Sequence, residues 1–376
     1  MDKDIFPIEA SVLKWARLRS GLSLDAAAAS FAKYGDWEKG LGGPTYPQLE
    51  KMAILYKLPV AVFFFPEPPE EPPIEETFRT LPGTTLSSLP GKIKFLIRKA
   101  KAFQINLSEL YGGRNPAERN ITKSLRFDLG ESPTRMAEQV RAFMGITIVT
   151  QKSWGSDEAA LKNWRHTLET LGVFVFKDSF EESNFSGFCL SDNEFPLIYV
   201  NNNCAKTRQI FTLFHELAHL LFETSGIDSV RELPARKGAS EQIEVLCNAF
   251  ASEFLVPSAA LKEARADRPA TEALAVELAS LFAVSREVIY RKFLDRREIS
   301  LASYNEAIGR WNEVKKSRPG GSYYNTKFAY LGAKYIGKTL SEYRQERISE
   351  RQAADYLDIK PRSLLNLEEK YLKSGT

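Results

Sequence analysis

The chain has 376 residues, of which 43% are hydrophobic and 26% are charged, and its net charge is +3. At about 100–200 residues per domain, this length predicts two or three domains, and the near-neutral charge neither favours nor excludes a nucleic-acid partner. The longest apolar run, Val60 to Phe65, is far shorter than the ~18 residues of a membrane span. The acidic N-terminus lacks the pattern of a signal peptide, and the three cysteines show no CxxC spacing. We therefore expect a cytoplasmic protein with no disulfides and no membrane partner.

The first 66 residues have the pattern of a small helical unit. Apolar residues at helical spacing predict one helix around residues 12–18 and another over 47–56. Between them, Ser23 is a suitable N-cap for a helix over 24–32. The apolar strip Val60 to Phe65 is expected to pack back on these helices.

A proline-rich linker and a basic segment follow. The sequence PEPPEEPP, Pro66 to Pro73, favours a stiff extended spacer. From Arg79 to Arg126 there are ten Lys and Arg residues against two Glu. In residues 92–101 an apolar stripe runs along a basic helix. We favour a solvated face above a core stripe, with a surface for nucleic acid or an acidic partner as the alternative.

The remaining chain alternates between helical and strand patterns. Helices are expected at 135–143 and 157–171, and strands at 173–176, 185–191 and 196–201. Asp192-Asn193 would connect the last two strands as an antiparallel hairpin. Helices resume at Lys206 and continue to about Arg310. After the break at Gly320-Gly321 the C-terminal segment is basic, with fourteen Lys and Arg against eight Asp and Glu over residues 310–376.

These changes in composition predict five parts. They are a degenerate helix-turn-helix-like unit (1–66), a Pro-rich linker (67–91), a basic helical connector (92–132), a mixed domain (133–310) and a basic helical module (311–376). The predicted fold class is α+β and mainly helical, with a small antiparallel sheet.

The residues best suited to chemistry lie in HELAH, residues 215–219. His215 and His219 are one helical turn apart, so both imidazoles can bind one metal ion. Glu216 lies about 100° round the helix, where it can act as general base on a metal-bound water. The apolar stripe of the helix is centred on Leu217, and both histidines lie about 160° from that centre. We therefore expect the pair to face a cleft.

A third metal ligand is expected to be a carboxylate, because His166 lies opposite the apolar face of its own helix and reads as a surface residue. Phe222 and Ser225 stand where a metzincin would have glycine and a third histidine, which excludes that class. Glu244 is favoured, because small residues at 247, 248 and 251 let its helix approach the HELAH helix. The alternatives are Glu223, Asp228, Glu232 and Glu241, while Cys247 is expected to be a packed core residue.

Two histidines and one glutamate leave a coordination position open, which is typical of a catalytic zinc site. Bound Zn²⁺ would polarise a peptide carbonyl, and Glu216 would carry a proton from water to the leaving amine. We expect the strand at 196–201 to form the edge of the cleft, where an extended peptide adds as a further strand.

With these residues the chain closely resembles the ImmA/IrrE family of metallo-endopeptidases. The resemblance rests on FTLFHELAHLLF and IEVLCNAFASEFLVP, which look like that family's two signature helices, and it covers about Gly172 to Leu294. It implies a gluzincin-like fold in which His215, His219 and Glu244 hold zinc and Glu216 is the catalytic base.

The N-terminal unit is similar to the Cro/repressor-type (XRE) helix-turn-helix found fused to many such peptidases. The similarity rests on LKWARLRSGLSLDAAA, WEKG and PTYPQLEKMA. Only residues 30–36 separate the second helix from Trp37, too few for a turn and a full recognition helix. Residues 1–66 carry eight basic and seven acidic side chains, which gives little attraction for phosphate. Protein recognition or a scaffold role therefore competes with DNA binding here.

Two later segments also have a helix-turn-helix pattern. Residues 273–296 are expected to form a structural helix pair that completes the peptidase domain. ISERQAADYLDIKPRSLLNLEEKYL, in the basic C-terminal module, is a candidate contact for DNA or a protein partner. That tail resembles the C-terminal module of family members associated with toxin–antitoxin operons, which implies an antitoxin or regulatory role.

We therefore predict a zinc-dependent regulatory endopeptidase that hydrolyses a peptide bond in one protein partner, such as a repressor or a toxin. The main alternative is a non-catalytic antitoxin or transcriptional regulator that binds a toxin or DNA and uses the metallopeptidase fold as a scaffold. A third candidate is a DNA-binding repressor whose peptidase domain senses a signal. The sequence makes no prediction of the oligomeric state.

Overall fold

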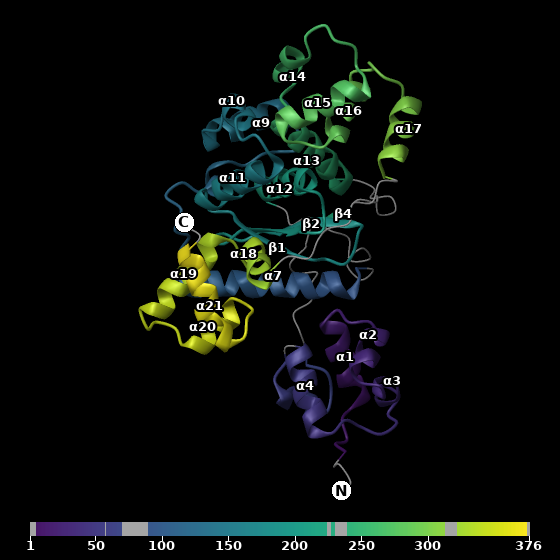
Figure 1. Ribbon diagram of the computed structural model, residues 1–376, viewed down its shortest axis with the longest axis vertical. Coiled ribbons are helices and arrows are strands. Elements are labelled where there is room, and N and C mark those ends of the chain that lie inside the picture. Colours follow the sequence, from purple (N-terminus) through teal and green to yellow (C-terminus); the bar gives the residue numbers. More distant parts are fainter. Residues whose placement is uncertain are drawn as a thin grey trace. The chain divides into compact units, whose positions relative to one another are not determined.

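The computed structural model describes residues 5–56, 58–69, 89–223, 227–229, 239–312 and 322–373, without the side chains of 227–229, 239–241 and 312. The chain forms two compact units, which are Met1–Lys101 with Phe180–Glu182, and Ala102–Ser179 with Ser183–Thr376 (Figure 1). The second unit holds both the predicted mixed domain and the basic C-terminal module. Most of the predicted linker (residues 70–88) and Gly320-Gly321 lie outside the described residues. The five-part division remains a prediction.

The N-terminal unit is helical, as expected. Its elements are α1 (Ala10–Arg19), α2 (Leu24–Ser30), α3 (Tyr34–Trp37), α4 (Tyr46–Tyr56) and the 3₁₀ helix η1 (Val60–Phe64). The Ser23 side chain caps α2 by accepting a hydrogen bond from the Ala26 amide. Phe63 of the apolar strip is buried against Tyr56, with ring centroids 6.3 Å apart. Helix α3 has four residues, so a full-length helix does not form at this position, as the spacing predicted.

The second unit is built on a four-stranded sheet of order β1-β3-β2-β4. The strands are β1 (Phe174–Asp178), β2 (Phe185–Leu190), β3 (Leu197–Asn201) and β4 (Ile227–Ser229). β2 and β3 pair antiparallel, as predicted, but β1 and β3 pair parallel, so the predicted antiparallel sheet is in fact mixed. The parallel pair arises because β1 and β2 are not neighbours. After the turn that follows β2, the chain returns as β3 between β1 and β2. Strand β3 is antiparallel to β2 and parallel to β1.

This strand order corrects one expectation about the site. β3 is flanked by β1 on one side and β2 on the other, so residues 196–201 do not form an edge of the sheet. Among the strands that the structure describes, β1 and β4 stand at the two ends of this order. An extended peptide that joins the sheet has to pair with one of these two strands.

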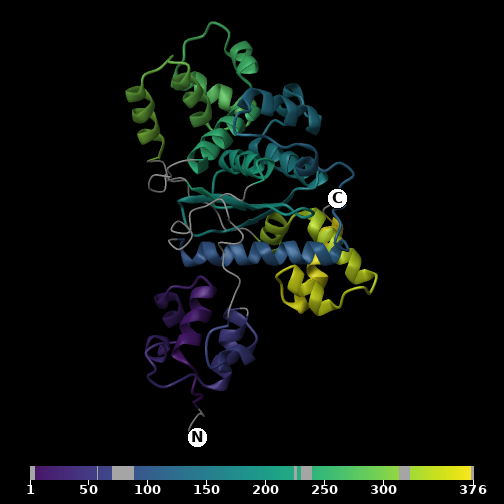
Figure 2. The same cartoon turned by 180° about the vertical axis from the view of Figure 1, so that it is seen from behind.

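Both faces of the sheet are buried, so its strands are apolar on both sides. Val175, Ile198 and Val200 belong to the large core that includes α11 (Asp157–Thr170) and α12 (Lys206–Leu221). Phe176 and Tyr199 point the other way. There Phe176 stacks at 4.3 Å on Phe103 of α7 (Gly91–Leu110), and residues 102–110 of this helix, which belong to the second unit, pass the sheet on the side opposite α12 (Figures 1 and 2).

Further helices cover the α12 side of the sheet. They are α8 (Ile121–Ser124), α9 (Pro133–Met144), α10 (Ile148–Lys152), α13 (Ala239–Leu255), α14 (Ser258–Arg265), α15 (Glu272–Phe282), α16 (Arg286–Asp295) and α17 (Leu301–Asn312). Helices α9 and α11 confirm the predictions at 135–143 and 157–171. The pair α15–α16 contributes Leu278 and Phe293 to the large core, as expected for a structural helix pair.

The C-terminal module consists of α18 (Tyr323–Leu331), α19 (Ala333–Arg344), α20 (Glu350–Tyr356), the 3₁₀ helix η2 (Pro361–Ser363) and α21 (Leu364–Lys373). It packs on β1 and α11, where the Arg165 guanidinium donates to the Ala329 carbonyl at 2.8 Å. Several of its basic side chains form ion pairs within the module. Lys327 pairs with Asp358 at 3.1 Å, and Arg347 with Glu342 at 3.0 Å. These pairs offset part of the positive charge that the sequence shows here.

In the described part of the chain, no single helix has both the length and the apolar character that a membrane span requires. Helices α13 and α14 meet that test only as a pair, and the pair is bent by 46°. Cys189, Cys204 and Cys247 form no disulfide in the structure.

Candidate metal centre

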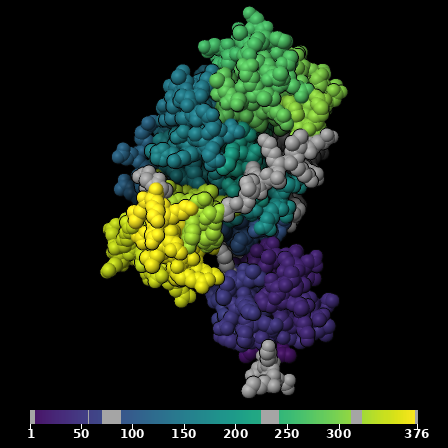
Figure 3. All heavy atoms as spheres, viewed as in Figure 1, coloured from purple at the N-terminus to yellow at the C-terminus, as the bar shows by residue number. Residues whose placement is uncertain are grey.

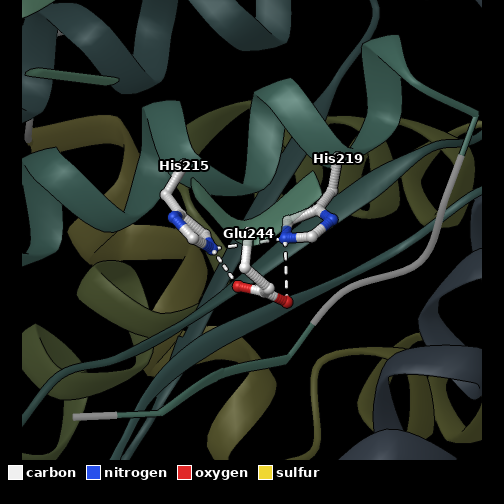
Figure 4. Close-up of side chains that lie close together, drawn as sticks. All are labelled: His215, His219 and Glu244. Carbon is white, nitrogen blue, oxygen red and sulfur yellow. Dashed lines mark hydrogen bonds and ion pairs between the residues drawn. The ribbon is translucent and has the colours of Figure 1, made fainter. Parts of the chain in front are cut away.

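The two histidines of HELAH and Glu244 converge between α12 and α13 (Figure 4). The Nε2 atoms of His215 and His219 are 3.2 Å apart. The Glu244 carboxylate lies across both rings. Its Oε2 is 3.4 Å from His215 Nε2, and its Oε1 is 3.5 Å from His219 Nε2. The three residues predicted as ligands thus form one group that can hold a metal ion.

Small residues bring the supporting elements together. Cys247 and Ala251, at i+3 and i+7 from Glu244, are fully buried in the core that α13 shares with α12. On another side of α12, Gly187 of β2 makes an even closer approach. A Cβ at Gly187 would lie 2.5 Å from Thr212 Cγ2 and 2.8 Å from the Tyr199 carbonyl oxygen, so no larger residue fits without a shift.

The two histidines are almost fully buried, and the cleft that they were expected to face remains a prediction. His215 is 1% exposed, His219 is 3% exposed and Glu216 is fully buried. On this face of α12, α13 places Glu244 across both rings and Asn248 beside His215. The Glu244 side chain is 20% exposed, so solvent reaches the group on the α13 side.

One supporting residue was missed by the sequence reasoning, which treated it only as small. Asn248 Oδ1 lies 3.1 Å from His215 Nδ1. An amide oxygen can only accept a hydrogen bond, so Nδ1 donates and the Nε2 lone pair is left for a metal. The signal in the sequence is its position one helical turn after Glu244, on the same face of α13.

Electrostatics agree with this arrangement. Burial raises the pKa of the Glu244 carboxyl, but the His215 and His219 imidazoles outweigh burial and hold that pKa well below its usual range. Burial, reinforced by the Glu244 and Glu216 carboxylates, raises the pKa of the Cys247 thiol well above its usual range. Cys247 is thus a neutral core residue, as expected, and both glutamates lie close enough to act on it.

The donor set fits zinc. Two imidazole nitrogens and a carboxylate are common zinc ligands, with bonds of about 2.0–2.2 Å. Around a tetrahedral ion at that distance, neighbouring donor atoms lie about 3.3–3.5 Å apart. The three separations in the structure, 3.2, 3.4 and 3.5 Å, match this value.

Of the alternative ligands, Glu223 has a described side chain, and it is not part of this group. Glu223 is exposed and forms an ion pair with Arg126 at 2.7 Å. Glu232 and the side chains of Asp228 and Glu241 lie outside the described residues. The third histidine, His166, is exposed on α11, as expected.

Comparison with known families supports a peptidase-type fold. Residues 168–294 match the model of a peptidase family described as the IrrE N-terminal-like domain. The match runs from the end of α11 to α16, contains His215, Glu216, His219 and Glu244, and includes the segment of the predicted ImmA/IrrE resemblance. Among curated proteins, none gives a significant match to this chain. The helix-turn-helix character of residues 1–66 and the toxin–antitoxin association remain predictions.

Proposed function

We propose that this protein is a zinc-dependent endopeptidase that hydrolyses a peptide bond in a specific protein partner. The observation that carries the proposal is the convergence of three donor atoms from two helices, 3.2–3.5 Å apart, inside a domain that matches a peptidase family. His215, His219 and Glu244 would hold the ion and leave one coordination position for the reaction.

The chemistry is divided between the ion and one side chain. When bound, zinc supplies Lewis-acid polarisation of the scissile carbonyl and lowers the pKa of water. Glu216, the residue after His215, accepts the proton of the attacking water and passes it to the leaving amine. Glu216 is fully buried, so its carboxylate lies in a medium of low dielectric. In such a medium nearby charges have a strong effect on the energy of proton transfer to and from the carboxylate.

A protein partner such as a repressor or toxin is favoured over DNA as the substrate or ligand. The helical N-terminal unit has nearly balanced charge, and several cations of the C-terminal module are engaged in ion pairs within the module. Phosphate contacts from these cations would first require those pairs to break. Salt-dependent binding of the full chain to its own promoter would nevertheless support the regulator alternative.

The test combines metal analysis with cleavage. Purified wild type, Glu216→Gln, His219→Ala and the control His166→Ala are analysed for zinc and incubated with a synthetic peptide library and with the product of the adjacent gene. We expect one zinc per chain in all but His219→Ala, and cleavage only by wild type and His166→Ala. Full cleavage by Glu216→Gln would refute the proposal. Zinc binding without cleavage by wild type would favour the non-catalytic scaffold.

A further inference from the structure

A cavity of about 1320 Å³ lies within the second unit, and the metal ligands do not line it. Its walls come from α11, the end of β1 and the start of α12 on one side, and from α18 and α19 of the C-terminal module on the other. Figure 3 shows the yellow-green C-terminal helices seated against the blue part of this unit. The volume exceeds the ~300–1,000 Å³ of a usual small-molecule site.

Lys177 is one of three buried charged residues that line this cavity, the others being Arg165 and Glu169. Its place on β1 puts its side chain on the same face as Val175, toward α11, and it lines the cavity while only 6% exposed. Among the described residues, no carboxylate or carbonyl accepts a hydrogen bond from its ammonium group. Buried lysines are normally paired with an anion, and Lys177 has no anionic partner among the described residues.

The surrounding charges do not supply that anion. Arg165 and Lys206 both act on Lys177 by repulsion. The nearest carboxylates are already engaged, since Glu169 accepts from Arg165 at 2.9 Å and Glu158 pairs with Lys206 at 2.9 Å. Burial and the two cations together lower the pKa of Lys177 to about 7, despite the opposing effect of Glu158 and Glu169.

The lining of the cavity is more basic than acidic and includes apolar side chains. Six Lys and Arg side chains line it against three glutamates. Apolar walls are formed by Met144, Leu161 and Phe328, among others. Arg165 and Lys206 are paired with Glu169 and Glu158, but both still act on Lys177 by repulsion, so Lys177 lies where the potential is positive. A positive potential around an unpaired ammonium group suits a doubly charged anion, and the apolar walls suit an organic body.

We propose that this cavity binds a small organic phosphate, with the phosphate group placed at Lys177 and the organic part against the apolar wall. The site is separate from the metal centre and does not depend on peptidase activity. A ligand there would contact the peptidase-like domain through α11 and the C-terminal module through α18 and α19.

The test is isothermal titration at pH 8 with phenyl phosphate, inorganic phosphate and benzoate as probes. Phosphate can also bind a metal ion, so the titrations use the full chain in a His219→Ala background. There Lys177→Met is compared with Lys262→Met, a lysine exposed on α14 and outside the cavity. Titration in two buffers of different ionisation enthalpy measures the protons taken up on binding.

We expect phenyl phosphate to bind more tightly than inorganic phosphate, and both more tightly than benzoate. Binding should take up protons, because an anion at Lys177 favours its charged form. Lys177→Met should weaken binding at least about tenfold and abolish the proton uptake, whereas Lys262→Met should change neither. Absence of phosphate binding below about 10 mM, equal binding by Lys177→Met, or preference for benzoate would overturn the proposal.

Discussion

His215 Nδ1 and Asn248 Oδ1 are 3.1 Å apart, and this contact joins the helix that carries HELAH to the helix that carries Glu244. Because the amide oxygen can only accept, the contact fixes the His215 tautomer that presents Nε2 to His219 and Glu244. A single polar residue on α13 thus orients a candidate metal ligand on α12.

Removing this hydrogen bond is expected to weaken the metal site. Asn248→Ala should lower zinc affinity about 10–100-fold, because the His215 ring loses the partner that holds its tautomer and orientation. Competition with a chromophoric chelator measures the affinity. Val245→Ala, at a 62% exposed position on the same helix, serves as control and should bind zinc like wild type. Equal affinity in both variants would show that Asn248 does not position His215.

The three residues of the candidate metal group could be predicted from the sequence to lie together, whereas the residues around them could not. His215 and His219 follow from helical periodicity, and Glu244 from the small residues spaced along its own helix. The role of Asn248 and the burial of both histidines depend on how α13 lies against α12. The packing of two helices that are separate in the sequence cannot be predicted from the apolar stripe of one of them.

The same distinction applies to the sheet and to the cavity that Lys177 lines. All three strands from residue 173 to 201 were predicted by local pattern, but the insertion of β3 between β1 and β2 was not, because strand order depends on long-range pairing. Lys177 stands at the end of VFVFK, where it looks like the polar end of a strand. The cavity that it lines is completed by the C-terminal module, more than 140 residues later in the chain.

Gly187 gives a test of the close approach between β2 and α12. Gly187→Ala should destabilise the protein by about 1–3 kcal/mol, since the new methyl group meets Thr212 and the Tyr199 carbonyl. Urea denaturation followed by circular dichroism measures the change. Gly309→Ala is the matched control, because a Cβ at this helical position meets nothing within 4 Å. It should stabilise the protein by up to about 1 kcal/mol. If Gly187→Ala and Gly309→Ala change the free energy of unfolding equally, the close approach of β2 to α12 does not restrict residue 187.

A buried ion pair anchors the far end of α13. Lys292 Nζ lies 2.7 Å from Glu253 Oε2, and the same carboxylate accepts hydrogen bonds from the Ser258 amide and hydroxyl at the start of α14. The two side chains are 9% and 11% exposed. The pair therefore ties α13 to both α14 and α16.

Loss of the cation from this pair is expected to be costly. Lys292→Met should lower the free energy of unfolding by about 3–5 kcal/mol, because Glu253 would remain buried without its counter-charge. For comparison, Arg291→Met removes an exposed pair with Asp295 from the same helix and should cost less than about 1 kcal/mol. Chemical denaturation at pH 7 gives both values. Similar costs for the two variants would mean that burial does not strengthen the Lys292–Glu253 pair.

The lowered pKa of Lys177 predicts that the free energy of unfolding depends on pH. Its pKa is lowered to about 7 in the folded protein, against about 10.4 in an unfolded chain. Between these values the unfolded state holds more protons at this site, so the contribution of Lys177 to stability rises with pH. Below pH 7 both states are protonated, and the penalty for burying the charge is constant. Lys177→Met removes the penalty.

The variant should therefore be more stable than wild type at pH 7, and the difference should shrink as the pH rises toward 10. The steepest change is about 1.4 kcal/mol per pH unit. Urea denaturation of both proteins at pH 6, 7, 8 and 9, in buffers free of phosphate, measures the difference directly, because the titration of all other groups cancels in it to first order. Lys262→Met should differ from wild type by a constant amount at every pH. A constant difference for Lys177→Met as well would mean that Lys177 keeps its ordinary pKa in the cavity.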